Sequence, residues 1–106
     1  MPSGLVVSVL PFEVRLSALA QRDRNSAEAW WRETRGPLEP SRLIRELAKA
    51  FDLLESNPRL GFPGTHRGRP ALKYRLACDF FLVYTVLPRR REVVILRILA
   101  ASRLHG

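Results

Sequence analysis

Three short runs rich in β-branched and aromatic residues occupy the second half of this chain, and they constrain its fold more than any other feature. These runs are Ala71–Ala77, Phe80–Leu87 and Val93–Leu99. The first alternates strictly, with Leu72, Tyr74 and Leu76 on one face and Lys73 and Arg75 on the other. The second is apolar almost throughout, as is typical of a central strand buried on both sides. Because only short turns separate the runs, they predict an antiparallel meander.

Two segments before these strands have helical spacing. Apolar residues recur every three or four positions from about Phe12 to Arg35, although the stripe weakens over residues 23–26, where a kink or two shorter helices are alternatives. A second stripe begins at Pro40 and ends at Asn57-Pro58, because the residue before a proline is disfavoured in a helix. The Gly36–Glu39 linker makes the two segments an antiparallel helical hairpin. We expect Trp30, Trp31 and Phe51 to lie in its core.

The remaining segments complete an α+β domain over residues 1–106. Leu5–Leu10 is β-branched and short, and predicts a first strand that ends at Pro11. Residues 58–70 are rich in Gly, Pro and basic side chains and predict a surface loop. The expected order is therefore β-α-α-β-β-β: an N-terminal strand, then a two-helix antiparallel hairpin packed on a mainly antiparallel C-terminal sheet.

The positive charge of the chain is segregated. The 106 residues carry a formal charge of +8. Residues 1–56 carry eight basic and eight acidic groups, whereas residues 57–106 carry ten basic groups against Asp79 and Glu92. Almost all of the cations are Arg, which suits bidentate contact with phosphate or carboxylate. The distribution predicts that a polyanion or an acidic protein partner meets the C-terminal half.

Several cations of that half are candidates for a shared anion-binding surface. Lys73 and Arg75 lie on the same side of the predicted sheet, since side chains two positions apart share a face. Arg97 is the one charge within the last predicted strand, so it must reach solvent, a carboxylate or a bound anion. Arg67, Arg69 and Arg103 can converge on the same surface. The alternative is a solvated sheet face whose cations have no further role.

Other chemistry has little support in the sequence. One cysteine and two histidines exclude a disulfide framework and are too few for a Cys/His zinc site, and no Walker, Rossmann or Ser/His/Asp pattern is present. We expect no metal and no cofactor. His66 and His105 are expected to be solvated, and nothing indicates that Cys78 is activated. Leu5–Leu10 is too short for a signal core or a membrane span, which favours the cytoplasm.

Five segments, taken in order, resemble the RelE/ParE family of toxins of type II toxin–antitoxin systems. They are Trp30-Trp31-Arg32, Leu43-x-x-Glu46-Leu47-x-x-Ala50, Asn57-Pro58-x-x-Gly61, Leu72-x-Tyr74-Arg75 and Phe81-Leu82-Val83-Tyr84-x-Val86. The resemblance extends over about residues 5–103 and implies a compact toxin held inactive by a small antitoxin with an acidic or amphipathic segment. Such a partner would explain the charge without any nucleic acid.

The target is left open, because members of this family either cut mRNA in the ribosome or inhibit DNA gyrase without known catalytic residues. The nuclease pattern implied by the resemblance is matched at Lys73, Arg75 and Arg103, has Phe81 where an arginine is expected, and leaves only His105 for the C-terminal tyrosine or histidine. The last strand, residues 95–99, resembles the gyrase-inhibiting branch, although Ala100 stands where a histidine often follows it. We expect a ParE-like gyrase inhibitor. The alternatives are a metal-independent endoribonuclease and a degenerate member that binds only its antitoxin.

Overall fold

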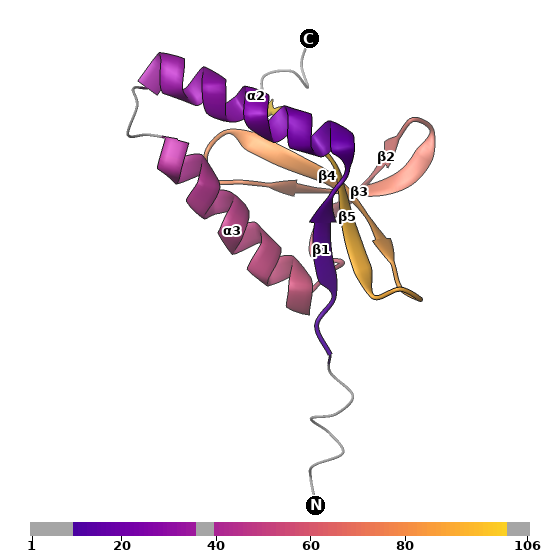
Figure 1. Cartoon of the computed structure of the whole chain (residues 1–106). Coiled ribbons are helices and arrows are strands. Elements are labelled where there is room, and N and C mark those ends of the chain that lie inside the picture. Colours follow the sequence, from indigo (N-terminus) through magenta and orange to yellow (C-terminus); the bar gives the residue numbers. More distant parts are fainter. Residues whose placement is uncertain (1–9, 36–39, 102–106) are drawn as a thin grey trace, which may run out of the picture.

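A five-stranded sheet with two helices on one face forms the architecture of this protein (Figure 1). The structure is a computed structural model that describes residues 10–35 and 40–101. The elements are β1 (Glu13–Leu16), α2 (Ala18–Arg35), α3 (Pro40–Ser56), β2 (Phe62–His66), β3 (Arg69–Arg75), β4 (Phe80–Leu87) and β5 (Glu92–Ala100). The strand order is β1-β5-β4-β3-β2, with β1 parallel to β5 and the other neighbours antiparallel. The predicted α+β class and the C-terminal meander are confirmed.

The start of the chain differs from the prediction. The first described strand is β1, within the segment that helical spacing assigned to the first helix, and α2 begins only at Ala18. Phe12, Val14 and Leu16 alternate with exposed Glu13 and Arg15, so these residues present an apolar edge to the core as a strand. Of the predicted strand Leu5–Leu10, only Leu10 lies within the described residues, and it has no regular structure.

The helices otherwise follow the predicted boundaries. Ser17 caps α2: its hydroxyl accepts a hydrogen bond from the Ala20 N–H at 3.0 Å. The helix then continues without interruption through residues 23–26 to Arg35, so the alternative of two shorter helices is wrong. The second helix spans Pro40–Ser56, as its stripe predicts. Neither described helix has the length and apolarity to cross a membrane.

The predicted loop over residues 58–70 is wrong in its second half. Phe62–His66 forms β2, which pairs with β3 from Phe62 opposite Lys73 to His66 opposite Arg69. The two-residue turn between them has positive φ at both positions, 52° at Arg67 and 77° at Gly68, which is the backbone that a tight hairpin needs. An arginine replaces the usual Asn or Asp at the first position, so the turn lacks its familiar sequence signal.

The main core lies between the helices and one face of the sheet. It includes Trp31, Leu47 and Leu54 from the helices and Leu82 and Tyr84 from β4, all buried. The first five residues of β4 are buried, which confirms a central strand covered on both faces. Trp31 is in the core as predicted, whereas Phe51 is only half-buried and Trp30 is 48% exposed. Trp30 lines a pocket at the edge of this core.

Candidate functional site

The sheet face without helices contains a small apolar cluster beside cations. Ala71, Phe81 and Val83 are buried there and pack with Leu99, separately from the main core. Lys73 stands opposite Val83 and Arg75 opposite Phe81 in the strand register. The shared face predicted for Lys73 and Arg75 is therefore confirmed, and the face combines apolar surface with positive charge.

Lys73 and Arg75 differ in their surroundings. The aliphatic stem of Lys73 lies against Gly64, where an added Cβ would be 3.2 Å from the lysine Cε. The Arg75 guanidinium donates a hydrogen bond to Asp79 at 3.0 Å, and both side chains are largely exposed. An exposed pair of this kind is screened by water and contributes little to stability. Arg75 thus remains accessible to an anionic partner.

Arg97 is held by a carboxylate of α2. Its Nε donates to Asp23 at 2.7 Å and its Nη2 donates at 3.1 Å, in a bidentate, part-buried pair. The hydrogen bonds with Asp23 raise the pKa of Arg97 above its usual range. Asp23 also accepts the Ile98 N–H at 2.9 Å, beyond the point where β1 stops pairing with β5. Of the options predicted for Arg97, the structure selects the internal carboxylate.

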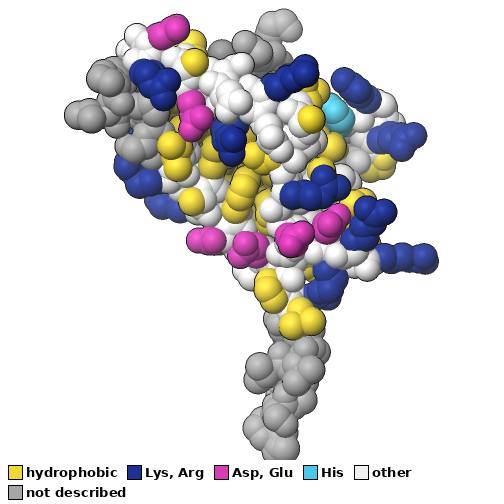
Figure 2. Space-filling model, in the orientation of Figure 1, with side chains coloured by type: hydrophobic (Ala, Val, Ile, Leu, Met, Phe, Trp, Pro, Cys, Tyr) yellow, Lys and Arg dark blue, Asp and Glu magenta, His cyan; other side chains and the backbone are white. Residues whose placement is uncertain are grey.

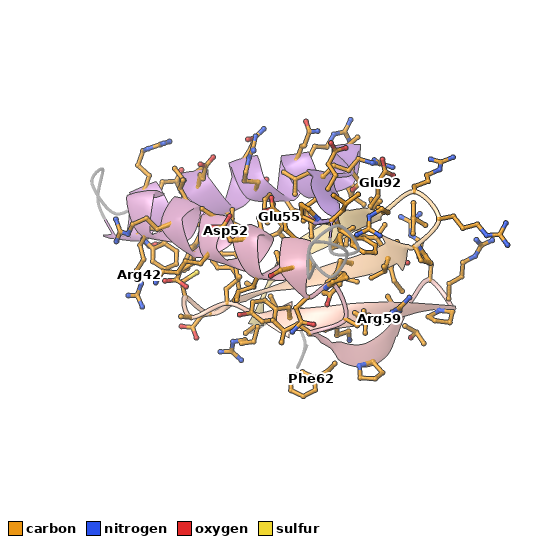
Figure 3. All side chains as sticks on the ribbon, turned by 90° about the horizontal axis from the view of Figure 1, so that it is seen from below. Arg42, Asp52, Glu55, Arg59, Phe62 and Glu92 are labelled. Carbon is orange, nitrogen blue, oxygen red and sulfur yellow. The ribbon has the colours of Figure 1, made fainter. Side chains whose placement is uncertain are left out.

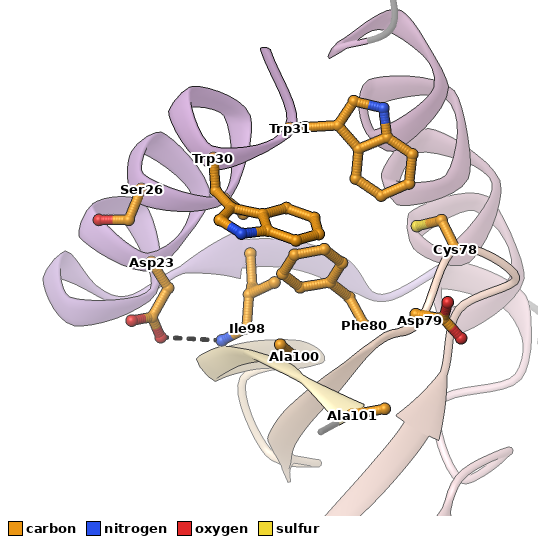
Figure 4. Close-up of a pocket in the computed structure, with 11 residues that line it drawn as sticks. Asp23, Ser26, Trp30, Trp31, Cys78, Asp79, Phe80, Ile98, Ala100 and Ala101 are labelled. Atoms are coloured by element: carbon orange, nitrogen blue, oxygen red, sulfur yellow. Dashed lines mark hydrogen bonds between the residues drawn. The ribbon is translucent and has the colours of Figure 1, made fainter. Parts of the chain in front are cut away.

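A pocket of about 520 Å³ opens next to this ion pair, between α2, the β3–β4 turn and the end of β5 (Figure 4). Aromatic rings form much of its wall: the Trp30 ring lies 6.1 Å from Phe80 and 6.0 Å from Trp31, in edge-to-face contacts. Asp23, Ser26 and Asp79 also line it. An apolar wall with a few polar groups suits an apolar side chain of a partner.

The titratable groups of the pocket do not favour covalent chemistry. Cys78 is buried in the pocket wall, and burial raises the pKa of its thiol. A thiol of raised pKa stays protonated near neutral pH, where it is a poor nucleophile. Asp23 is already paired with Arg97. The groups that line the pocket therefore suit binding of a side chain rather than a covalent step.

The remaining candidate residues do not converge with this pocket. Arg67 and Arg69 lie at the β2–β3 turn, at the opposite end of β3 from Arg75. His66 lies at the end of β2, opposite Arg69. Arg103 and His105 lie outside the described residues. The predicted six-cation surface is thus kept only in part among the described residues. The register places Lys73, Arg75 and Arg97 on the open sheet face, although Arg97 is paired with Asp23. Arg67 and Arg69 lie at the far end of β3.

Sequence reasoning missed two features of this surface. Pocket residue Trp30 was assigned to the core but is 48% exposed, because it points about 100° away from buried Trp31 on the helix. The Arg89–Arg91 run, which lies in the short turn between the last two predicted strands, was not among the candidates, although all three arginines are exposed. The phase of the helix was the signal for Trp30, and the place of the arginines between two predicted strands was the signal for Arg89–Arg91.

The sequence of this chain matches the model of one protein family. A sequence model of the family described as "ParE toxin of type II toxin-antitoxin system, parDE" matches residues 14–105. No curated protein matches the chain.

Solved structures with a similar fold come from bacteria and an archaeon. One chain of the toxin–antitoxin complex RelBE2 from Mycobacterium tuberculosis is 26% identical, with a TM-score of 0.64, covering 86% of this chain and 99% of that one. A chain of the chromosomal ParDE system from P. aeruginosa is 18% identical, with a TM-score of 0.69 and coverage of 84% and 95%. A chain of the RelE–RelB complex from Pyrococcus horikoshii is 16% identical, with a TM-score of 0.60 and coverage of 89% and 99%.

Proposed function

This chain belongs to the family of ParE toxins of type II toxin–antitoxin systems, within the wider RelE/ParE group, and from that premise we propose that it inhibits DNA gyrase by binding alone. In this proposal the toxin acts in the cytoplasm, where gyrase and DNA are found. A small antitoxin holds it inactive.

The observation that carries this proposal is the composition of the face around Lys73 and Arg75. Phe81, a buried apolar residue, stands opposite Arg75, where the nuclease pattern expects an arginine. The carboxylate that contacts Arg75, that of Asp79, already accepts a hydrogen bond from it. Cleavage of RNA needs a group that takes the proton of the attacking hydroxyl. The described strand partners of Lys73 and Arg75 are Phe62, Val83 and Phe81, and none of them is such a base.

The antitoxin is proposed to bind the open sheet face and the aromatic pocket together. The cluster of Ala71, Phe81 and Val83 supplies apolar surface, and Lys73 and Arg75 supply positive charge beside it. An amphipathic segment with acidic residues complements both. The exposed Trp30 ring gives such a segment an apolar anchor point. The similar chains from M. tuberculosis and P. aeruginosa belong to toxin–antitoxin systems, which supports an antitoxin as partner.

The decisive experiment exposes supercoiled plasmid to purified gyrase with the toxin, and in parallel exposes translating ribosomes to the toxin. We expect cleaved plasmid to accumulate only when gyrase is present, and mRNA to stay intact. A Lys73→Gln/Arg75→Gln double variant serves as the control for the ribosome arm. Codon-phased mRNA cuts that disappear in this variant would overturn the proposal.

One observation keeps the nuclease as a second candidate. Lys73 and Arg75 do lie on one face, as the nuclease pattern requires, and Arg103 matches a third position of that pattern in the sequence. In that case Lys73, Arg75 and Arg103 would stabilise the charge that develops on the phosphate. Failure of both arms of the experiment would instead favour a degenerate member that binds only its antitoxin.

A further inference from the structure

Two arginine-bearing hairpin tips lie at one end of the sheet, away from the aromatic pocket. The β2–β3 tip carries Arg67 and Arg69, and the β4–β5 tip carries Arg89 and Arg90. Both tips are at the same end because β3 begins where its antiparallel neighbour β4 ends. Figure 2 shows Lys and Arg side chains gathered over this end of the molecule. We call these four arginines the arginine fork.

The two prongs of the fork diverge. Pairing between β3 and β4 runs only from Arg75–Phe81 to Leu72–Tyr84, although each strand continues for three more residues toward its tip. Pro70 lies in that stretch and has no N–H to donate to a neighbouring strand. A cleft of about 320 Å³, lined by Arg59, Pro70 and Thr85 among others, lies between the prongs. The fork therefore has a basic residue at its base as well as at both tips.

The fork arginines are not used within the fold. All four are exposed, and none forms an ion pair with another described residue. Arg91, next in sequence, differs because it donates to the Leu10 carbonyl and lies 4.9 Å over the Phe12 ring. Glu92 begins β5 directly after this tip, but Arg15 pairs with it at 3.6 Å. The charge of the fork is thus available to a partner.

The four exposed arginines of the fork suit a partner that carries a row of phosphate groups. We infer that the arginine fork binds the phosphate backbone of duplex DNA, one prong on each side of a phosphate row. Arginine contacts phosphate oxygens in a bidentate manner and reads no sequence when it does so. Single-stranded nucleic acid is generally held by aromatic rings that stack on bases, and the two described tips carry no Phe, Tyr or Trp. This inference does not depend on gyrase inhibition.

The test measures binding of the free full-length chain to a short duplex of mixed sequence by fluorescence anisotropy, over a series of salt concentrations and without gyrase. Four phosphate contacts predict a slope of log K against log salt of about −3.6. We expect Arg89→Gln/Arg90→Gln and Arg67→Gln/Arg69→Gln each to bring the slope to about −1.8. Circular dichroism confirms that each variant is folded.

The matched control removes the same charge elsewhere. Arg32→Gln/Arg42→Gln lies on the helices, whose exposed side chains include Arg42 at the far end of the molecule (Figure 3). It should leave the slope near that of the native chain. Equal loss in this control would mean that net charge alone drives binding, and would overturn the fork. Absence of duplex binding at low salt, or tighter binding to single-stranded RNA or to polyglutamate, would also overturn it, while gyrase inhibition could still stand.

Discussion

At the scale of single residues, Asp23 joins three groups that would otherwise lack a partner at one edge of the sheet. Its carboxylate receives two hydrogen bonds from Arg97 and one from the Ile98 backbone. The side chains of Asp23 and Arg97 are 13% and 26% exposed, so water replaces these bonds poorly. One carboxylate therefore anchors α2 to the unpaired edge of β5.

Replacing Asp23 by Asn tests this anchor. The amide keeps the size of the side chain but removes its charge, which leaves a part-buried guanidinium without its counter-ion. We expect the free energy of unfolding to fall by about 2–3 kcal/mol in a urea titration. The matched control, Asp79→Asn, removes the exposed pair with Arg75 and should cost less than about 0.5 kcal/mol. Equal losses in the two variants would contradict the assigned role of Asp23.

Cys78 and Tyr84 predict how stability responds to alkaline pH. Burial raises the pKa of the Cys78 thiol above 9.0 and of the Tyr84 hydroxyl above 10.0, so both groups lose their protons more readily in the unfolded chain. Their contribution is complete below the unfolded pKa values and is lost as pH rises through the folded ones. The unfolding free energy should therefore decline above about pH 9, by the same linkage. The decline should be shallower in Cys78→Ala; an identical slope would exclude the thiol as a cause.

At the scale of elements, the junction between α3 and β2 depends on one close approach. The Gly61 N–H donates to the buried Tyr84 hydroxyl at 2.8 Å. A Cβ at Gly61 would come within 2.6 Å of the Lys73 carbonyl oxygen and 2.9 Å of the Tyr84 hydroxyl. Backbone occupies one side of that space, so a larger residue must displace β2 from β3.

We expect Gly61→Ala to lower the unfolding free energy by about 2 kcal/mol, because overpacking against backbone forces a shift. Gly64→Ala is the control: its added Cβ meets the flexible Lys73 stem at 3.2 Å, which can move aside. Thermal denaturation compares the two variants. A smaller drop in melting temperature for Gly61→Ala than for Gly64→Ala would show that the junction is not constrained in this way.

The same elements show what the sequence could and could not predict. Strands β3, β4 and β5 were predictable because their faces differ in polarity or are buried throughout. Strand β2 was not, because Pro63 and Gly64 disfavour strands on average and only pairing with β3 makes them extended. Phe12, just before β1, and Leu16, at its end, also fit a helical stripe, so a strand of four residues could not decide between the two periods. Tertiary pairing decided both cases.

At the scale of the whole molecule, the charged and apolar partner surfaces lie at different ends of the sheet. The arginine fork lies at the β2–β3 and β4–β5 tips, and the aromatic pocket lies by the β3–β4 turn. The sequence predicted the excess charge of the C-terminal half but not this division, because the two ends of a strand as long as β3 lie far apart. Arg67 and Arg75 therefore lie at opposite ends of β3, although only eight positions separate them.

This division predicts separate effects on the two rate constants of antitoxin binding. We expect the net charge of +8 to attract the proposed acidic antitoxin over a distance. The association rate should then fall as salt rises from about 0.1 M to about 1 M and the Debye length shortens from about 10 Å to about 3 Å. Trp30→Ala removes the apolar anchor and should mainly raise the dissociation rate, by about tenfold or more. Surface plasmon resonance measures both constants. An association rate independent of salt would argue against attraction by charge, and a Trp30→Ala complex that dissociates at the native rate would place the antitoxin away from the pocket.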